Sequence, residues 1–258
     1  MGYIEIARAS IIYQNFVLKD LLFPKKFCNS FLYFKVNRKL ANKKIIGVFG
    51  GTFDPVHLAH LRLAEEIKQE FLLEELRLVP SADPPHRATP DATAGQRLAM
   101  LKLALKGNQS LKVDDREIKR SGPSFTIDTL REIRKEVPNK PLALIMGIDV
   151  FVQLPTWHEW EKIFNLAHII VAERAGYGAI PLVDRALEPL KSHVIKRLNI
   201  NRFKLQENLS GNIFVYKFTA LAISSTMIRN NMAQNKSLKY LIPETVWKYI
   251  EREGLYKH

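Results

Sequence analysis

Two histidines, His57 and His60, stand three residues apart behind a turn that contains two glycines and the pair Asp54-Pro55. The turn follows an apolar run over residues 45–49, which is typical of a buried parallel strand. Glycines there let the backbone approach a ligand closely and adopt positive φ. Asp54 and Pro55 predict an N-cap followed by the first helical position. A helix that starts here offers free N–H groups and carries both imidazoles on one face, so the stretch suits a bound phosphate.

A metal site is the alternative interpretation of the two histidines, since His-x-x-His can supply two ligands of one ion. No glutamate or third histidine follows at the spacing of a zinc protease, so we expect no metal held by protein side chains. The sequence also lacks Gly-x-Gly-x-x-Gly, which argues against an ordinary dinucleotide dehydrogenase. It lacks Gly-Lys-Ser/Thr, which argues against a P-loop enzyme.

A second group of chemically useful residues stands near the C-terminus, where Ile223, Ser224, Ser225 and Thr226 precede Arg229. The hydroxyls can cap a helix whose N–H groups meet phosphate, and Arg229 falls on its first turns. Alone, this pattern indicates only an ordinary capped helix. Together with the histidine stretch at the other end of the sequence, it predicts a polyphosphate site.

The elements that must position these residues follow an alternating pattern from residue 44 onward. Strands are expected at 45–49, 76–80, 111–113, 142–146, 168–172 and 213–217. Helices are expected at 58–71, 95–106, 126–136 and 157–166, near 183–198 within a variable connection (176–212), and twice after the last strand. This alternation predicts an α/β fold, a Rossmann-like doubly wound parallel sheet followed by C-terminal helices. Such sheets bind ligands beyond the carboxyl ends of the strands, where the strand order reverses.

Composition divides the 258 residues into two unequal parts. In residues 1–43, apolar and basic clusters alternate without a clear signal peptide, so we expect a poorly ordered or adventitious extension and a single domain over 44–258. The formal charge is +13, of which residues 1–44 carry +7, so the rest is only mildly basic. We therefore expect neither a nucleic-acid partner nor, without a run of ~20 apolar residues, a membrane partner. Cys28 is the only cysteine, which fits a reducing compartment, and we expect a cytoplasmic protein.

Residues 50–60 resemble the first motif of the adenylyl/cytidylyl-transferase superfamily, whose core is His-x-Gly-His, with Ala59 in place of the glycine. Residues 223–229 resemble its second motif, a serine-rich turn that opens a late helix. Further stretches are similar to one family of this superfamily, the bacterial nicotinate-nucleotide adenylyltransferases. These stretches are 84–87, 115–117, 124–130, 147–149, 155–160 and 240–256. The resemblance covers about residues 44–257.

The resemblance implies adenylyl transfer from ATP to nicotinate mononucleotide, giving nicotinate adenine dinucleotide and pyrophosphate in NAD biosynthesis, with Mg²⁺ brought by ATP. It implies catalytic roles for His57, His60 and Arg229. The implied ATP-binding residues are Gly50, Gly51, Thr52, Phe53, Asp149, Ile223, Ser224, Ser225 and Thr226. The implied residues for nicotinate mononucleotide are His86, Arg87, Thr126, Asp128, Trp157 and His158.

Each implied role has a physical basis and an ordinary alternative. Trp157 offers a flat face to a pyridine ring, although a tryptophan on an amphipathic helix is often a core residue. Arg87 suits bidentate contact with a phosphate, and a charged side chain in a solvated loop is the alternative. Asp149 can accept hydrogen bonds from ribose hydroxyls, and Asp128 fits an ordinary helix surface as well as a binding site.

Two other functions stay open on sequence alone. The acceptor could instead be nicotinamide mononucleotide or phosphopantetheine, although the stretches 126–130 and 155–160 favour a pyridine nucleotide. From a different class, a basic nucleic-acid-binding protein would need lysines, arginines and aromatic residues clustered on one face. Only residues 1–43 offer such a mixture.

Overall fold

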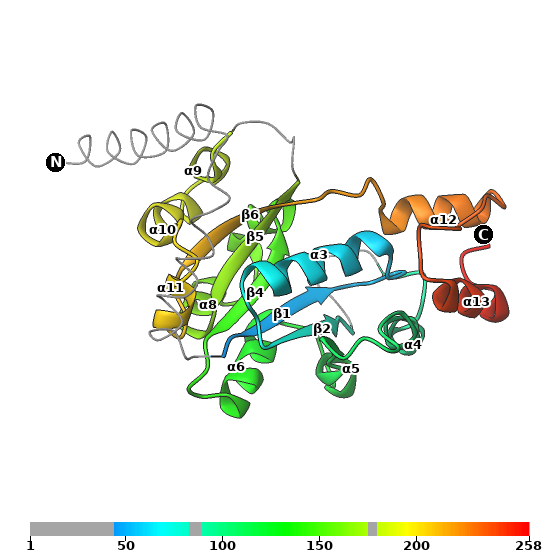
Figure 1. Cartoon of the computed structure of the whole chain (residues 1–258), viewed down its shortest axis with the longest axis horizontal. Helices are drawn as coiled ribbons and strands as arrows, with labels where there is room; N and C mark the ends of the chain where they lie inside the picture. The colour runs from blue at the N-terminus through cyan, green and yellow to red at the C-terminus, as the bar shows by residue number, and fades with distance from the viewer. Residues whose placement is uncertain (1–43, 83–88, 175–179, 258) are drawn as a thin grey trace, which may run out of the picture. The chain divides into compact units, whose positions relative to one another are not determined.

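A six-stranded parallel sheet, in the order β3-β2-β1-β4-β5-β6, forms the centre of the part of the chain that the structure describes (Figure 1). The structure is a computed structural model that describes residues 44–82, 89–174 and 180–257. The strands are β1 (Ile46–Gly51), β2 (Glu75–Pro80), β3 (Leu111–Val113), β4 (Leu142–Gly147), β5 (His168–Arg174) and β6 (Ile213–Phe218). All neighbours pair in parallel, and the order reverses between β1 and β4. The predicted doubly wound sheet is therefore confirmed.

The helices alternate with the strands as predicted, with differences where periodicity is weak. They are α3 (Leu58–Glu70), α4 (Ala94–Ala104), α5 (Arg116–Lys119), α6 (Thr126–Glu136), α7 (Ile148–Phe151), the 3-10 turn η1 (Leu154–Thr156), α8 (Trp160–Leu166), α9 (Leu182–Arg185), α10 (Leu190–Arg197), α11 (Lys204–Glu207), α12 (Ser225–Ala233) and α13 (Glu244–Glu253). The helix predicted from residue 157 begins only at Trp160, because Trp157 is extended and Glu159, with φ at 49°, lies in the left-handed region. The single helix predicted near 183–198 is two separate helices, α9 and α10. None of the described helices is both long and apolar enough to span a bilayer.

Helices cover both faces of the sheet because neighbouring strand residues point in opposite directions. In β1, Phe49 belongs to a buried cluster with side chains of α3, α4, α12 and α13. Ile46 and Val48 belong to a second cluster with side chains of α6, α8 and α10. A strand with apolar residues on both faces reads as a continuous apolar run, which is the pattern that residues 45–49 display.

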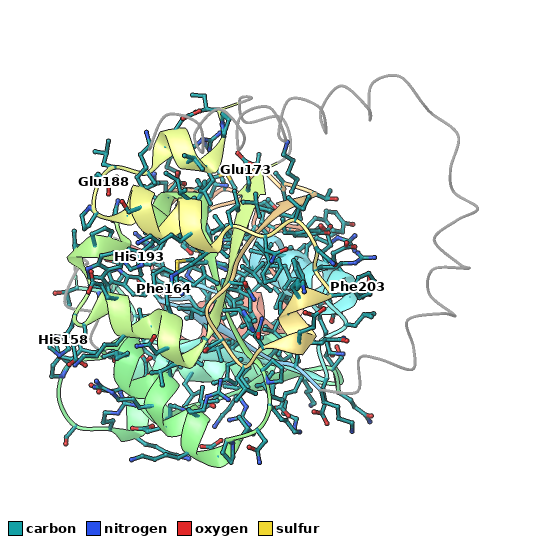
Figure 2. All side chains as sticks on the ribbon, turned by 90° about the vertical axis from the view of Figure 1, so that its left-hand side faces the viewer. His158, Phe164, Glu173, Glu188, His193 and Phe203 are labelled. Carbon is teal, nitrogen blue, oxygen red and sulfur yellow. The ribbon has the colours of Figure 1, made fainter. Side chains whose placement is uncertain are left out.

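Helix α10 buries the apolar residues Leu190 and Val194 and also makes aromatic contacts with α8. The rings of His193 and Phe164 stack with centroids 5.2 Å apart, and both side chains lie between the two helices in Figure 2. The guanidinium carbon of Arg197 lies 4.7 Å from the centroid of the same Phe164 ring.

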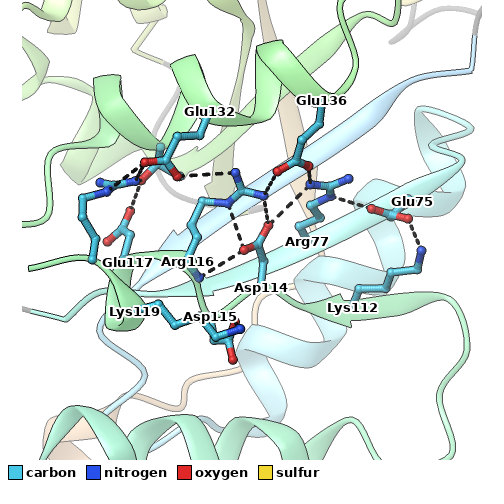
Figure 3. Close-up of polar contacts among 12 residues, drawn as sticks. Glu75, Arg77, Lys112, Asp114, Asp115, Arg116, Glu117, Lys119, Glu132 and Glu136 are labelled. Carbon is cyan, nitrogen blue, oxygen red and sulfur yellow. Dashed lines mark hydrogen bonds and ion pairs between the residues drawn. The ribbon is translucent and has the colours of Figure 1, made fainter.

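An ion-pair network holds α6 against β2 and α5 (Figure 3). Glu136 of α6 accepts from Arg77 at 2.6 Å and pairs with Arg116 at 2.9 Å. Asp114 pairs with Arg116 at 2.7 Å and faces Arg77 at 3.5 Å. Both arginine side chains are less than one-fifth exposed, whereas that of Glu136 is 48% exposed, so only part of this network is shielded from solvent. The network fixes α6, the helix that begins at Thr126.

His168, as a neutral imidazole, hydrogen-bonds the start of β5 to the loop before β6. Its Nδ1 accepts the backbone N–H of Asn212 at 3.1 Å, so its Nε2 carries the proton and donates to the carbonyl of Asn208 at 3.0 Å. The side chain is fully buried, and burial lowers the pKa of His168 to about 4. Protonation of Nδ1 would break the bond from Asn212, so the folded state resists taking up that proton.

This imidazole predicts a loss of stability in acid. Below about pH 6.5 the unfolded chain binds a proton at His168 that the folded chain refuses until about pH 4. The free energy of unfolding should therefore fall between these pH values, by up to about 3 kcal/mol from this residue, and be unaffected by it above pH 6.5. His168→Gln should flatten that part of the pH profile measured by urea unfolding. His158→Gln, at an exposed histidine, is the control; equal profiles for the two variants would contradict the prediction.

Candidate active site

A cleft of about 680 Å³ opens at the carboxyl ends of the strands. Its lining includes residues at or just beyond the ends of four strands, Gly51, Ser81, Gly147 and Phe218, and Ala172 near the end of β5. This is the edge at which a doubly wound sheet binds ligands, and β1 and β4 meet there at the reversal of strand order.

Most of the residues singled out in the sequence meet in this cleft. The lining includes His57, His60 and Arg229; Gly50, Gly51, Thr52, Phe53, Asp149, Ile223, Ser224, Ser225 and Thr226; and Thr126, Trp157 and His158. Asp128 is outside the lining. His86 and Arg87 lie outside the described residues.

The glycine turn after β1 uses its two glycines differently. A Cβ on Gly51 would lie 2.9 Å from the ring of Phe53, so this glycine makes room for a protein side chain. A Cβ on Gly50 would meet nothing within 4 Å, so this glycine keeps the floor of the cleft open. The expected positive φ belongs to neither glycine but to Phe53, at 51°. The Phe53 ring is buried and packs edge-on against the His60 ring at 5.1 Å, which supports that imidazole from behind.

The two imidazoles lie stacked at the start of α3. The ring centroids of His57 and His60 are 3.7 Å apart and the rings are inclined by 19°. His57 is 5% exposed, and burial lowers its pKa to about 4. At neutral pH the free protein therefore holds His57 as a neutral imidazole that can still donate or accept a hydrogen bond.

Asp54 is not the N-cap that its position before Pro55 predicted. The helix begins at Leu58, and the Asp54 carboxylate instead accepts the backbone N–H groups of Asp91 at 2.8 Å and Ala92 at 3.2 Å. It also accepts the hydroxyl of Tyr256 at 2.5 Å. The carboxylate is thus used by two distant segments of the chain rather than by the helix that follows it.

The serine turn of α12 joins the loop that contains Asp54. Ser224 is the N-cap of α12, as predicted, and its hydroxyl accepts the N–H of Met227 at 3.2 Å. The Ser225 hydroxyl donates to the carbonyl of Pro55 at 3.0 Å. The two sequence motifs, 170 residues apart, therefore touch directly at one edge of the cleft.

Arg229 is held at the same edge by two oxygens. Its Nη1 donates to the backbone carbonyl of Asp54 at 2.8 Å, and its Nε lies 2.5 Å from the carboxylate of Asp91. The arginine side chain is 29% exposed and lines the cleft. Its guanidinium is thus placed before any ligand enters.

A buried arginine that sequence analysis missed, Arg97 of α4, ties neighbouring turns together. It is 1% exposed and donates to the carbonyls of Thr52 at 2.8 Å, Ser81 at 2.6 Å and Ala82 at 3.0 Å. A further bond reaches the carbonyl of Ala92 at 3.2 Å. Burial lowers the pKa of Arg97, while the charge of the nearby Asp54 opposes that shift. A charged residue on the buried face of an otherwise apolar helix was the available signal.

The other wall of the cleft gathers the residues predicted for the pyridine nucleotide. Thr126 opens α6, while Trp157 and His158 precede α8, and all three line the cleft. The rings of Phe125 and His158 lie 4.6 Å apart, which brings the two segments together. Trp157 is half-buried, so part of its indole packs on the core and part is available to the cleft.

Asp128 is outside the cleft lining, but an ion pair links it to this wall. Its carboxylate pairs with Arg131 at 3.0 Å, and Arg131 also pairs with Glu159, the residue that follows His158. Glu117, for which no role was predicted, lines the cleft instead. Its carboxylate accepts the hydroxyl of Thr129 at 2.7 Å, and burial raises the pKa of Glu117.

The bond between Tyr256 and Asp54 predicts a stability difference between two tyrosines. Tyr256→Phe leaves a buried carboxylate one donor short, so we expect the free energy of unfolding to fall by about 1.5–3 kcal/mol. Tyr240 is 77% exposed, and Tyr240→Phe should change it by less than about 0.5 kcal/mol. Urea unfolding of the two variants measures both values. Equal small effects would mean that Asp54 does not depend on this hydroxyl.

Known proteins match both the fold and the sequence. The solved structure of Plasmodium falciparum nicotinic acid mononucleotide adenylyltransferase complexed with NaAD superimposes with a TM-score of 0.61 and 19% identity, covering 83% of this chain and 97% of that chain. A Methylococcus capsulatus protein named "Probable nicotinate-nucleotide adenylyltransferase" is 44% identical over 213 residues, covering 82% of this chain and 99% of that protein. A Pseudomonas fluorescens protein of the same name is 45% identical over 215 residues, covering 83% of this chain and 98% of that protein.

The family model described as Cytidylyltransferase-like matches residues 48–231, a range that contains both phosphate motifs. At 44–45% identity over nearly the full length of the relatives, the match is far above what a shared fold alone would give. The chain belongs to the cytidylyltransferase-like proteins and, among them, to the nicotinate-nucleotide adenylyltransferases.

Proposed function

We propose that this chain transfers the adenylyl group of ATP to nicotinate mononucleotide. A phosphate oxygen of the mononucleotide attacks the α-phosphorus of ATP in line, the new P–O–P bond forms, and the bond to pyrophosphate breaks. The products are nicotinate adenine dinucleotide and pyrophosphate. The observation that carries the proposal is the meeting of the stacked histidines, the Arg229 edge and the Trp157 wall in one cleft.

This reaction needs no nucleophile from the protein, because the acceptor phosphate is itself the nucleophile. Catalysis then consists of holding two anionic substrates in line and stabilising charge as it develops. His57 and His60 are the donors that we assign to the oxygens of the α-phosphate. A bound triphosphate favours the charged imidazolium, so it should raise the low pKa of His57 as the substrate arrives.

The Arg229 edge is the site that we assign to the β- and γ-phosphates. A planar guanidinium suits phosphate oxygens, and α12 begins with N–H groups that can add to it. As the α-phosphorus bond breaks, negative charge grows on the departing pyrophosphate. A cation placed there in advance therefore stabilises the transition state more than the ground state.

The opposite wall is the site that we assign to the pyridine nucleotide. Trp157 supplies a flat surface for the ring. The start of α6 at Thr126, together with the backbone beside His158, supplies donors for a ring carboxylate. Asp149, exposed beyond β4, can accept ribose hydroxyl groups on the ATP side.

Divalent metal belongs to this proposal as a companion of ATP, with Mg²⁺ as the ion. The carboxylate of Asp54 is occupied by three protein donors, so it is not free to serve as a ligand. Among the described residues no group of three or more His, Cys, Asp or Glu side chains is placed to hold a metal ion. Phosphate oxygens and water, the ligands that Mg²⁺ prefers, would then form its shell and neutralise part of the triphosphate charge.

The names of the relatives support nicotinate mononucleotide as the acceptor. The Plasmodium falciparum neighbours, solved with NaAD and with APC, support a cleft for nucleotide ligands. The amide nucleotide and phosphopantetheine remain as competing acceptors. We also propose a cytoplasmic location, in keeping with a chain that has a single cysteine.

Pyrophosphate release from ATP and Mg²⁺ tests the proposal directly. Parallel reactions would contain nicotinate mononucleotide, its amide or phosphopantetheine as acceptor. We expect clear preference for the acid. Preference for another acceptor would support adenylyl transfer but show that the Trp157 wall does not bind nicotinate mononucleotide. No pyrophosphate release with any acceptor would refute adenylyl transfer.

The role of His57 predicts a loss of turnover rather than of substrate binding. His57→Gln should lower kcat by roughly 10²–10³, as for other lost transition-state donors, and leave ATP affinity within a few-fold. His193 lies between α8 and α10, outside the cleft lining, and His193→Gln is the matched control with unchanged kcat. An unaltered kcat in His57→Gln would remove this residue from the chemistry.

The role of Trp157 predicts the opposite kinetic signature. Loss of a stacking surface should weaken the ground state and the transition state alike, so Trp157→Leu should raise KM for nicotinate mononucleotide about 10-fold with little change in kcat. Trp247 of α13 packs against the other buried cluster and does not line the cleft, so Trp247→Leu is the control. Initial rates at varied mononucleotide concentration separate the two parameters. Equal KM values for both variants would speak against ring stacking on Trp157.

A further inference from the structure

Asp91 forms an ion pair with Arg229, the cation that we assign to the departing pyrophosphate. The Nε of Arg229 lies 2.5 Å from a carboxylate oxygen of Asp91, and its Nη1 already donates to the carbonyl of Asp54. Asp91 itself lines the cleft and its side chain is 59% exposed. The Asp91 carboxylate is therefore paired with the Arg229 guanidinium in the place where the more highly charged triphosphate must bind.

The position of Asp91 is set by the backbone and not by the ion pair alone. Its N–H donates to the Asp54 carboxylate at 2.8 Å, beside the bond from Ala92 to the same carboxylate. The Asp91 side chain therefore begins from a fixed point beside Arg229. Asp54 anchors both partners, one through its carboxylate and the other through its carbonyl.

We propose that Asp91 is a positioning residue that holds the Arg229 guanidinium in the free protein and gives it up to the phosphates of ATP. This inference rests on the proposed function, in which Arg229 binds the β- and γ-phosphates. Asp91 keeps the cation near its working place and at the same time lowers its affinity for phosphate, because the entering anion must displace a like-charged carboxylate. On the product side, the carboxylate re-forms the pair as pyrophosphate leaves.

Asp91→Asn isolates this effect, since it keeps the shape and the backbone bond and removes only the charge. Inorganic pyrophosphate, titrated into the full-length protein with and without Mg²⁺ in a calorimeter, is the probe. We expect binding to the variant to tighten about 3- to 10-fold, the range for a partly exposed ion pair plus the loss of one like charge. Unchanged or weaker binding would overturn the proposal.

Two further variants decide whether the effect passes through Arg229. Glu207→Gln is the control, because it also removes one negative charge and breaks a similarly exposed ion pair, the one with Lys204 of α11. Helix α11 leads into the end of β6 that is far from the cleft, so this variant should leave the pyrophosphate affinity unchanged. In an Arg229→Gln background, Asp91→Asn should lose most of its effect on that affinity. If the tightening persisted there, Asp91 would act by general repulsion and not by holding the guanidinium.

Steady-state kinetics supply a readout that a purely structural role would not move. Asp91→Asn should lower KM for ATP about 3- to 10-fold without raising kcat, because the carboxylate is displaced from Arg229 when ATP binds, before the bond to the α-phosphorus breaks. A fall in kcat/KM for ATP would overturn the proposal. Failure of the proposed function would appear separately, as no turnover by the unaltered protein with any acceptor, while the pyrophosphate titration would still judge Asp91.

Discussion

The carboxylate of Asp54 is 4% exposed and accepts three hydrogen bonds, two from the backbone at Asp91 and Ala92 and one from Tyr256. A buried charge is tolerable only when such donors surround it, so the segments that supply them must close around this one group. The Asp54 carbonyl then accepts from Arg229. One residue thus joins four segments: the turn after β1, the loop before α4, α12 and the C-terminal segment. The Arg229 edge of the cleft forms where these four segments meet.

The cleft combines two kinds of electrostatic preparation. Arg229 carries a permanent charge and is held in place by oxygens of the protein. His57 is kept neutral by burial, and its pKa should rise only when an anion approaches. A permanent cation at the leaving group and inducible donors at the reacting phosphorus suit a reaction in which charge moves from one to the other.

Much of this arrangement follows from patterns that a sequence displays locally. Continuous apolar runs and helical periods predict the six strands and a helix at Thr126–Glu136 with its true bounds, because burial on two faces or one leaves a distinct period. The N-cap expected at Asp54 was wrong, since nothing near it in sequence reveals that Tyr256, 202 residues later, takes its carboxylate. The motif that contains Asp128 has a related limit, since Asp128 does not line the cleft while Thr126 of the same motif does. A motif places a residue on a helix, but the turn of that helix decides which way the side chain faces.

Arg97 restrains the backbone on one side of the cleft. One guanidinium grips carbonyl groups from the turn after β1, at Thr52, and from the segment after β2, at Ser81 and Ala82. These two stretches of backbone therefore cannot separate without breaking buried hydrogen bonds. Arg97 thus fixes the spacing between Thr52 and Ser81, two residues that line the cleft, although Arg97 does not line it itself.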